Sequence, residues 1–285
     1  MSEEKTKVRS PGVAGMFYPS GGGRLDGLID KLSREEKPHI STGPVPGTIT
    51  GGIVPHAGIE YCGRQAVHFF ETLKINGFVP DTAVILHPSH RGAGPPLSVD
   101  DHHSWEVSNG TLKTDLEFAG ELNLPFSATA QAVEHSAEVI VPYIIHFLPG
   151  HVKLVSVNMV DQSYGAAKEV AVKIHAASLK LKRRLLLIAS SDFSHFLRRP
   201  EAREMDDIVL NEIMSRNTEG VYRVVRENNI SVCGYGPVMT VMEYSSMLDP
   251  EYGIKILSRG DSGDETDSSD VVSYISALFY TAPSV

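Results

Sequence analysis

The sequence predicts an α/β protein in which helices flank a mostly parallel or mixed central sheet. Short apolar segments typical of buried strands alternate with segments whose apolar residues recur at helical spacing. This alternation is typical of a largely parallel sheet that is covered on both faces. No clear linker divides the 285 residues, so we expect a single domain over residues 1–285.

The expected elements follow one another in a regular order. A first helix over residues 25–32 is followed by a Ser/Thr/Gly/Pro-rich loop over residues 40–47. Six buried strands are expected at residues 48–54, 82–86, 152–160, 184–189, 253–257 and 270–279. Four further helices are indicated by apolar faces made of Ala66, Phe69, Phe70 and Leu73; Ala167, Val170, Ala171 and Ile174; Met205, Ile208, Val209 and Ile213; and Val238, Val241 and Met242.

Charge and cysteine content indicate which partners and compartment to expect. The formal net charge of -9 argues against nucleic acid, and the basic cluster at residues 180–184 is interpreted as a solvated helix end. The strongest apolar run, residues 185–189, is too short to cross a bilayer, and residues 1–10 lack the apolar core of a secretory signal. Two cysteines do not make a disulfide framework. We therefore expect a cytoplasmic protein without nucleic-acid or membrane partners.

Polar residues follow three of the expected strands. His56 comes just after the first strand, His90 after the second, and Asp192 and His195 after the fourth. In an open α/β sheet, ligands bind beyond the carboxyl ends of the strands. We therefore expect these four side chains to meet at one edge of the sheet.

Cys233 adds a thiol to this group, because it directly precedes a helix in which Pro237 suits the first turn. The positive end of that helix is expected to favour the thiolate. Two histidines and a thiolate, His56, His90 and Cys233, suit Zn, Cu or non-haem Fe rather than Mg or Ca. The alternative is a polar pocket without a metal, in which each histidine is a hydrogen-bonded loop residue.

Three further residues are candidates for the same pocket. Cys62 could be a redox partner of Cys233, or a small buried residue at a helix start. Glu134 and His135 could line the pocket, or belong to an ordinary helix start with acidic residues.

Several short strings together resemble the Memo family (mediator of cell motility). They are VAGMFYP at residues 13–19, PHAG at 55–58, YCG at 61–63, PSH at 88–90, EHSAE at 134–138 with Pro142 and Tyr143, SSDFSH at 190–195, and CG at 233–234. They occur in order, and the resemblance extends from about residue 8 to about residue 280. One departure is His87, which stands where a small residue is expected before Pro88.

The resemblance implies a fold similar to the LigB-type class III extradiol dioxygenases, which open catechol rings with non-haem iron. It also implies metal binding by His56, His90 and Cys233, with Asp192 and His195 as neighbours. Those dioxygenases use two histidines and a glutamate, so a cysteine in place of the glutamate changes the charge and redox potential of the metal. Microbial relatives resemble one component of a set with a radical-SAM enzyme and an AMMECR-type protein, which are thus expected partners.

Two functions remain open at this stage. The first is a metal-dependent redox or dioxygenase-like protein with Fe, Cu or Zn, in which Asp192 orients His195 as the acid/base. The second is a binding module or adaptor, in which the same pocket holds phosphopeptides or other anionic ligands. A small molecule or a peptide is the expected ligand in either case.

Overall fold

The computed structural model describes residues 6–132 and 134–282. Its strands are β1 (Val8–Arg9), β2 (Ile49–Val54), β3 (Thr82–Pro88), β4 (Leu97–Val99), β5 (Ser104–Val107), β6 (Gly110–Lys113), β7 (Lys153–Met159), β8 (Leu185–Ser190), β9 (His195–Arg198), β10 (Gly253–Asp261) and β11 (Asp270–Tyr280). Its α-helices are α1 (Gly22–Glu36), α2 (Ile59–Ile75), α3 (Leu116–Glu121), α4 (Ala128–Ala132), α5 (Val141–Phe147), α6 (Tyr164–Leu181), α7 (Arg199–Met214), α8 (Thr218–Glu227) and α9 (Tyr235–Leu248). Short 3-10 turns lie at Lys37–His39, Glu138–Ile140 and Ser262–Asp264.

The central sheet is mixed, with the strand order β10-β11-β2-β8-β3-β7-β4. β2, β8, β3 and β7 run parallel, whereas β4, β10 and β11 pair antiparallel with their neighbours. β9 adds a short antiparallel pairing to β11. The fold class predicted from the sequence is therefore confirmed.

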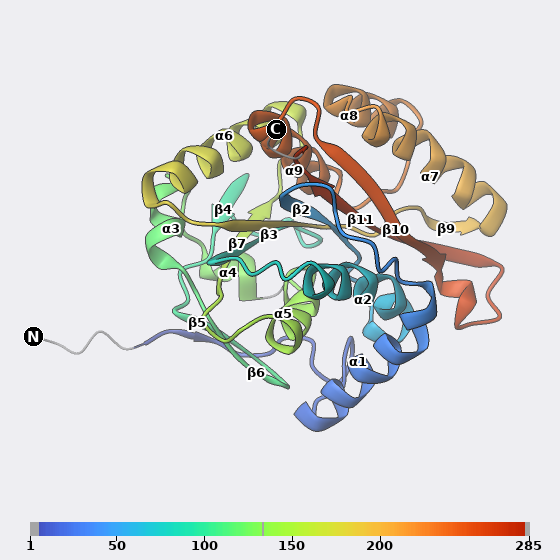
Figure 1. Cartoon of the computed structure of the whole chain (residues 1–285), viewed down its shortest axis with the longest axis horizontal. Helices are drawn as coiled ribbons and strands as arrows, with labels where there is room; N and C mark the ends of the chain where they lie inside the picture. The colour runs from blue at the N-terminus through green and yellow to red at the C-terminus, as the bar shows by residue number, and fades with distance from the viewer. Residues whose placement is uncertain (1–5, 133, 283–285) are drawn as a thin grey trace, which may run out of the picture.

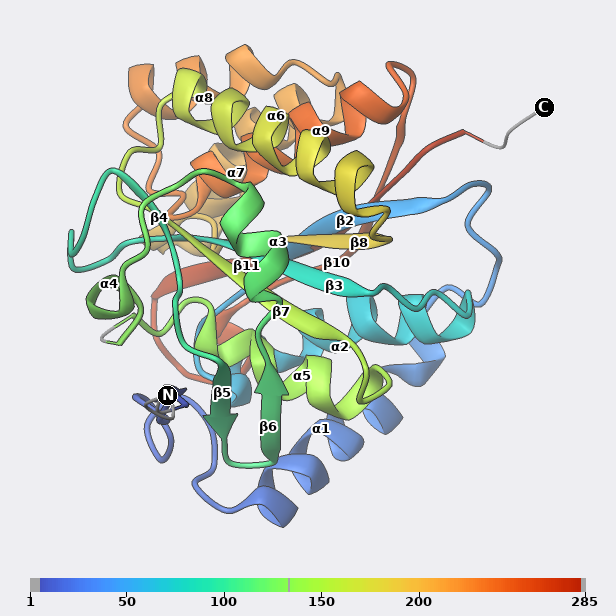
Figure 2. The same cartoon turned by 90° about the vertical axis from the view of Figure 1, so that its left-hand side faces the viewer.

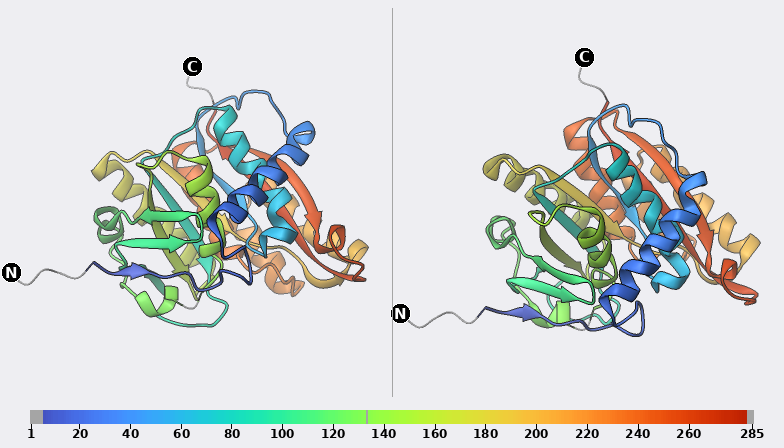
Figure 3. Two further views of the ribbon diagram at one scale, coloured as in Figure 1. Left: turned by 90° about the horizontal axis from the view of Figure 1, so that it is seen from below. Right: turned by 60° about the horizontal axis from the view of Figure 1, so that its bottom comes forward.

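Helices cover both faces of this sheet (Figure 1). α6, α7, α8 and α9 lie on one side, and α1, α2 and α5 lie on the other, as the turned view also shows (Figure 2). The small sheet β1-β5-β6 lies beside the second layer, next to the amino-terminal end (Figure 3). Within the described residues, no helix combines the length and the apolar character needed to span a bilayer.

The sheet divides the hydrophobic core into two parts, one under each helix layer. In β8, Leu187 and Ala189 belong to the core under α6 and α9, while Leu186 and Ile188 belong to the core under α1 and α2. Successive side chains of a strand point to opposite faces, so a strand buried on both faces is apolar throughout. This is why continuous apolar runs, rather than alternating ones, marked the central strands in the sequence.

The sequence patterns predict no strand between residues 89 and 150, and a helix start only as one alternative at Glu134 and His135. This segment forms β4, β5, β6, α3, α4 and α5, all of them short. The strand β3 also extends two residues beyond the expected 82–86, which places His87 inside the sheet. Of the amino-terminal segment 1–10, residues 1–5 lie outside the described part of the chain.

Candidate metal centre

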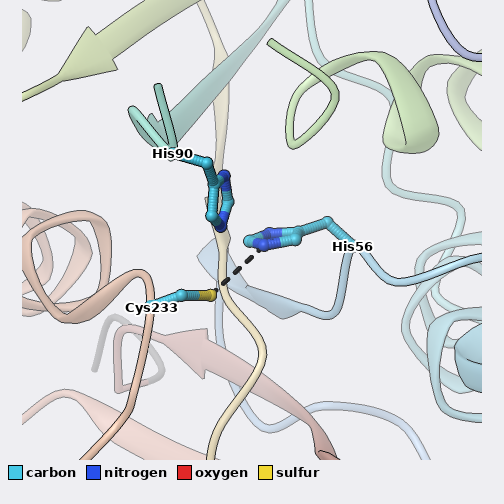
Figure 4. A group of neighbouring side chains, drawn as sticks. All are labelled: His56, His90 and Cys233. Atoms are coloured by element: carbon cyan, nitrogen blue, oxygen red, sulfur yellow. Dashed lines mark hydrogen bonds between the residues drawn. The ribbon is translucent and has the colours of Figure 1, made fainter. Parts of the chain in front are cut away.

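His56, His90 and Cys233 converge at the carboxyl edge of the parallel strands (Figure 4). One ligand atom from each lies within 4.8 Å of the other two, and Sγ of Cys233 is 3.2 Å from Nε2 of His56. Metal–ligand bonds of 2.0–2.3 Å in a tetrahedral site place ligand atoms roughly 3.3–3.8 Å apart. A small side-chain adjustment would therefore bring all three onto one ion.

The topology explains how residues so far apart in sequence meet. His56 follows the end of β2 by two residues and His90 follows β3 by two, and these parallel strands end at the same edge. Cys233 reaches that edge from the start of α9 because its neighbour is a glycine. A Cβ on Gly234 would lie 2.3 Å from the carbonyl oxygen of Ser190. Any side chain there would push the cysteine away from β8.

Hydrogen bonds determine which nitrogen of His56 faces the cluster. The Ser190 hydroxyl donates to the carbonyl of Ser136 at 2.6 Å, so its oxygen accepts from Nδ1–H of His56 at 2.7 Å. Nε2 then carries the free lone pair. Burial, together with the neighbouring His90, lowers the pKa of His56 well below its ordinary value. The ring is therefore neutral, which is the form that binds metals.

His90 is held in the same tautomer by Glu134. The carboxylate accepts from Nδ1 of His90 at 2.9 Å and from its backbone N–H at 2.7 Å. Burial alone would raise the pKa of Glu134, but hydrogen bonds from His135 and His90 hold it well below its usual range. The ionised carboxylate thus fixes the proton on Nδ1 and leaves the lone pair of Nε2 of His90 available to a metal ion.

Ser136 connects Ser190, which lies behind His56, with Glu134, which lies behind His90. Its carbonyl accepts from Ser190, and its hydroxyl and backbone N–H lie 2.9 and 3.1 Å from the Glu134 carboxylate. A carboxylate or hydroxyl behind each histidine is the arrangement that orients metal-binding imidazoles in proteins. Sequence reasoning did not single out Ser136 or Ser190, although both lie in the strings that carry the family resemblance.

The expectation that the start of α9 favours a Cys233 thiolate is wrong for the metal-free chain. Burial of Sγ and the nearby carboxylate of Asp192 raise the pKa of Cys233 well above its ordinary value, although the residue as a whole is only partly buried. The cost of removing the thiolate charge from water outweighs the stabilisation of that charge by the helix end, even though α9 begins only two residues after Cys233. The protonated thiol has two acceptors within reach, Nε2 of His56 at 3.2 Å and the Asp192 carbonyl at 3.5 Å.

His135 and Glu134 both lie beside the three converging residues. The His135 ring is 4.6 Å from that of His90 and 5.5 Å from that of His56, and Phe17 packs on it at 4.5 Å. His90, Glu134 and His135 also form a group with the spacing of metal ligands. The Glu134 carboxylate already accepts several hydrogen bonds there, so we interpret it as a support for His90.

Asp192 and His195 adjoin the cluster, but among the described residues their side chains do not hydrogen-bond each other as expected. Oδ1 of Asp192 accepts the backbone N–H of His56 at 2.8 Å, and Oδ2 lies 4.0 Å from Nε2 of His56. Nδ1 of His195 donates instead to the carbonyl of Ser231 at 2.8 Å, and Ser231 Oγ accepts the His195 backbone N–H. Ser231, rather than Asp192, therefore orients His195, with Nδ1–H directed at the Ser231 carbonyl.

Cys62 and His87 lie behind the centre. Cys62 is fully buried, and its thiol donates to the Ala57 carbonyl at 3.2 Å. His87 is also fully buried, with Nδ1 3.1 Å from Ser136 Oγ and Nε2 3.1 Å from Oε1 of Gln131. Neither belongs to a group with metal-ligand spacing among the described residues.

The fold and this centre define an α/β protein with a His/His/Cys cluster at the sheet edge, and comparisons identify its family. The model of the Memo-like protein family matches residues 9–278, so the chain belongs to this family. A MEMO1 family protein of Methanocaldococcus jannaschii is 37% identical over 95% of this chain and 99% of its own length. One from Desulfurococcus amylolyticus is 35% identical over 96% and 99%.

A solved structure has the same fold. The crystal structure of the uncharacterized protein JW3007 from Escherichia coli K12 matches 81% of this chain and 99% of its own, with a TM-score of 0.56 and 12% identity. At this identity the likeness concerns the fold alone.

Proposed function

We propose that the chain is a metal-dependent redox protein, related in mechanism to non-haem dioxygenases, whose ion is held by His56, His90 and Cys233. The observation that carries the proposal is the paired support of the two imidazoles, each with Nδ1 bonded from behind, while Nε2 of His56 faces Sγ of Cys233 at 3.2 Å. One thiolate and two imidazoles suit Fe, Cu or Zn, and three protein ligands leave a coordination position open for a substrate.

A bound ion would act as a Lewis acid toward the substrate and, if it is Fe or Cu, as an electron carrier. Cys233 must lose its proton to bind. The hydrogen bond of His195 supports a role for it in proton transfer. Nδ1 donates to the Ser231 carbonyl, so Nε2 is the nitrogen that can accept a proton. Asp192 is a second proton acceptor beside the ion position, since burial raises the pKa of its carboxyl.

The first test is the metal content of protein purified without chelator. We expect about one equivalent of Fe, Cu or Zn in the wild type, and strongly reduced content in His56→Ala, His90→Ala and Cys233→Ser. His151→Ala, which alters an exposed histidine outside the cluster, is the matched control and should keep its metal. Wild-type protein that binds none of the three ions on reconstitution would overturn the proposal.

The second test separates holding the ion from moving protons. His195→Ala should keep its metal and lose turnover by roughly 10²- to 10⁴-fold in oxygen-uptake assays with catechol-type and thiol substrates. Loss of metal equal to that of His56→Ala would contradict this division. Metal-loaded wild type without oxygen uptake, but with tight binding of phosphopeptides, would favour the binding module instead.

A further inference from the structure

The loop that carries Cys233 has little regular structure of its own. Residues 230–234 form no helix or strand, and α9 begins only at Tyr235. Ligands on such loops need supports, because a metal site tolerates displacements of only about 0.5 Å. What holds this loop therefore decides where Sγ lies.

One side of the loop is fixed by the end of β8. The Cys233 N–H donates to the carbonyl of Asp192, and the Asp192 N–H donates back to Sγ at 3.2 Å. The Gly234 N–H donates to Oγ of Ser191 at 3.0 Å. These bonds attach the loop to the strand that lies next to β2, from which His56 comes.

His195 hydrogen-bonds Ser231 at the start of this loop, and the Cys233–Gly236 end is held by a side chain from the segment after β7. Gln162 follows β7, and its Nε2 donates to the Cys233 carbonyl at 2.8 Å. Its Oε1 accepts from the backbone N–H of Gly236 at 2.9 Å, in the first turn of α9. A Cβ on Gly236 would lie 2.9 Å from Cβ of Gln162, so glycine permits this close approach.

We propose that Gln162 is a positioning residue for the metal centre, which fixes the Cys233 backbone and the start of α9 so that Sγ is directed at the ion. The inference rests on the proposed metal function. Gln162 forms hydrogen bonds to both ends of the Cys233–Gly236 segment, so it sets the direction of the Cys233 side chain. His56 and His90 receive no hydrogen bond from Gln162 among the described residues, and their supports at Ser190 and Glu134 are separate.

The test uses Co(II) as the probe, because its charge-transfer absorption reports the thiolate bond directly. Gln162→Met keeps the length of the side chain and removes both hydrogen bonds. Gln162→Asn keeps an amide that is one methylene too short to span the loop, and serves if the Met variant does not fold. Ser163→Ala is the matched control, since Ser163 caps α6 in the same connection and its hydroxyl accepts from Ala166.

We expect both Gln162 variants to bind Co(II) about 10- to 100-fold more weakly, the usual effect of removing a support behind a metal ligand. Their thiolate-to-cobalt absorption per bound ion should fall or shift, while Ser163→Ala keeps the wild-type spectrum. A Gln162 variant with wild-type affinity and spectrum, or a Ser163→Ala variant that changes them equally, would overturn the inference. If the wild type itself shows no thiolate-to-cobalt band, Cys233 is not a ligand and the proposed function fails first.

Discussion

His87 should make the fold sensitive to mild acid. The ring is fully buried in β3, and burial lowers its pKa from 6.5 to about 4. Between these pH values the unfolded chain binds a proton at His87 that the folded chain does not, so stability falls as the pH falls through this window. At about 1.36 kcal/mol per pKa unit, the whole difference amounts to about 3 kcal/mol.

The variant His87→Asn removes this proton while keeping a polar side chain. Urea unfolding at pH 7 and pH 5, with chelator present, measures how much stability each protein loses. Between pH 7 and pH 5, the proton uptake of His87 in the unfolded chain lowers the free energy of unfolding by about 2 kcal/mol. The wild type should therefore lose about that much more stability than the variant. The low pKa of His56 acts in the same direction, but it is common to both proteins and cancels.

The control is His151→Ala, which removes an exposed histidine and should lose as much stability as the wild type. If His87→Asn loses as much between pH 7 and pH 5 as the wild type does, His87 is not the neutral buried group described above.

Three further predictions concern the centre and its surroundings. Because the Cys233 thiol is protonated in the metal-free chain, each ion that binds should release about one proton from it. The logarithm of metal affinity should therefore rise by about one per pH unit, and an affinity that does not depend on pH would contradict this. Ser190→Ala removes the acceptor behind Nδ1 of His56 and should weaken metal binding about 10- to 100-fold in a competitive titration, whereas unchanged affinity would show that this bond does not orient the ring. Arg9 and Glu138 form an ion pair that is buried on both sides. Glu138→Gln leaves the guanidinium of Arg9 without its counter-charge and should lower the free energy of unfolding in urea by about 3–5 kcal/mol, whereas a loss below about 1 kcal/mol would argue against the pair.

Much of the fold could be predicted because it depends on local patterns. Continuous apolar runs marked the central strands, and helical spacing marked α2, α6, α7 and α9. The short elements between residues 89 and 150 left no such signal. Strands of three or four residues, such as β4 and β5, are too short to show a period, and β4 pairs with the distant strand β7.

The converging ligands could also be predicted, since strand ends of a parallel sheet share one edge. The residues that hold these ligands in place could not be predicted. Ser136, Ser231 and Gln162 act through hydrogen bonds to residues 36 to 74 positions away, and a serine or glutamine in a loop carries no sequence pattern that names its partner. The charge state of Cys233 was predicted wrongly because the helix end is visible in the sequence, whereas the packing around Sγ is not.

We expect one metal ion to be bound by His56, His90 and Cys233 together. Crystals of protein purified without chelator, measured at the iron, copper and zinc absorption edges, test this most directly and also identify the metal. We predict one anomalous peak about 2.0–2.4 Å from Nε2 of His56, Nε2 of His90 and Sγ of Cys233. A peak bound through Nδ1 of either histidine, or an ion held by other residues while Cys233 keeps its thiol proton against His56, would contradict it.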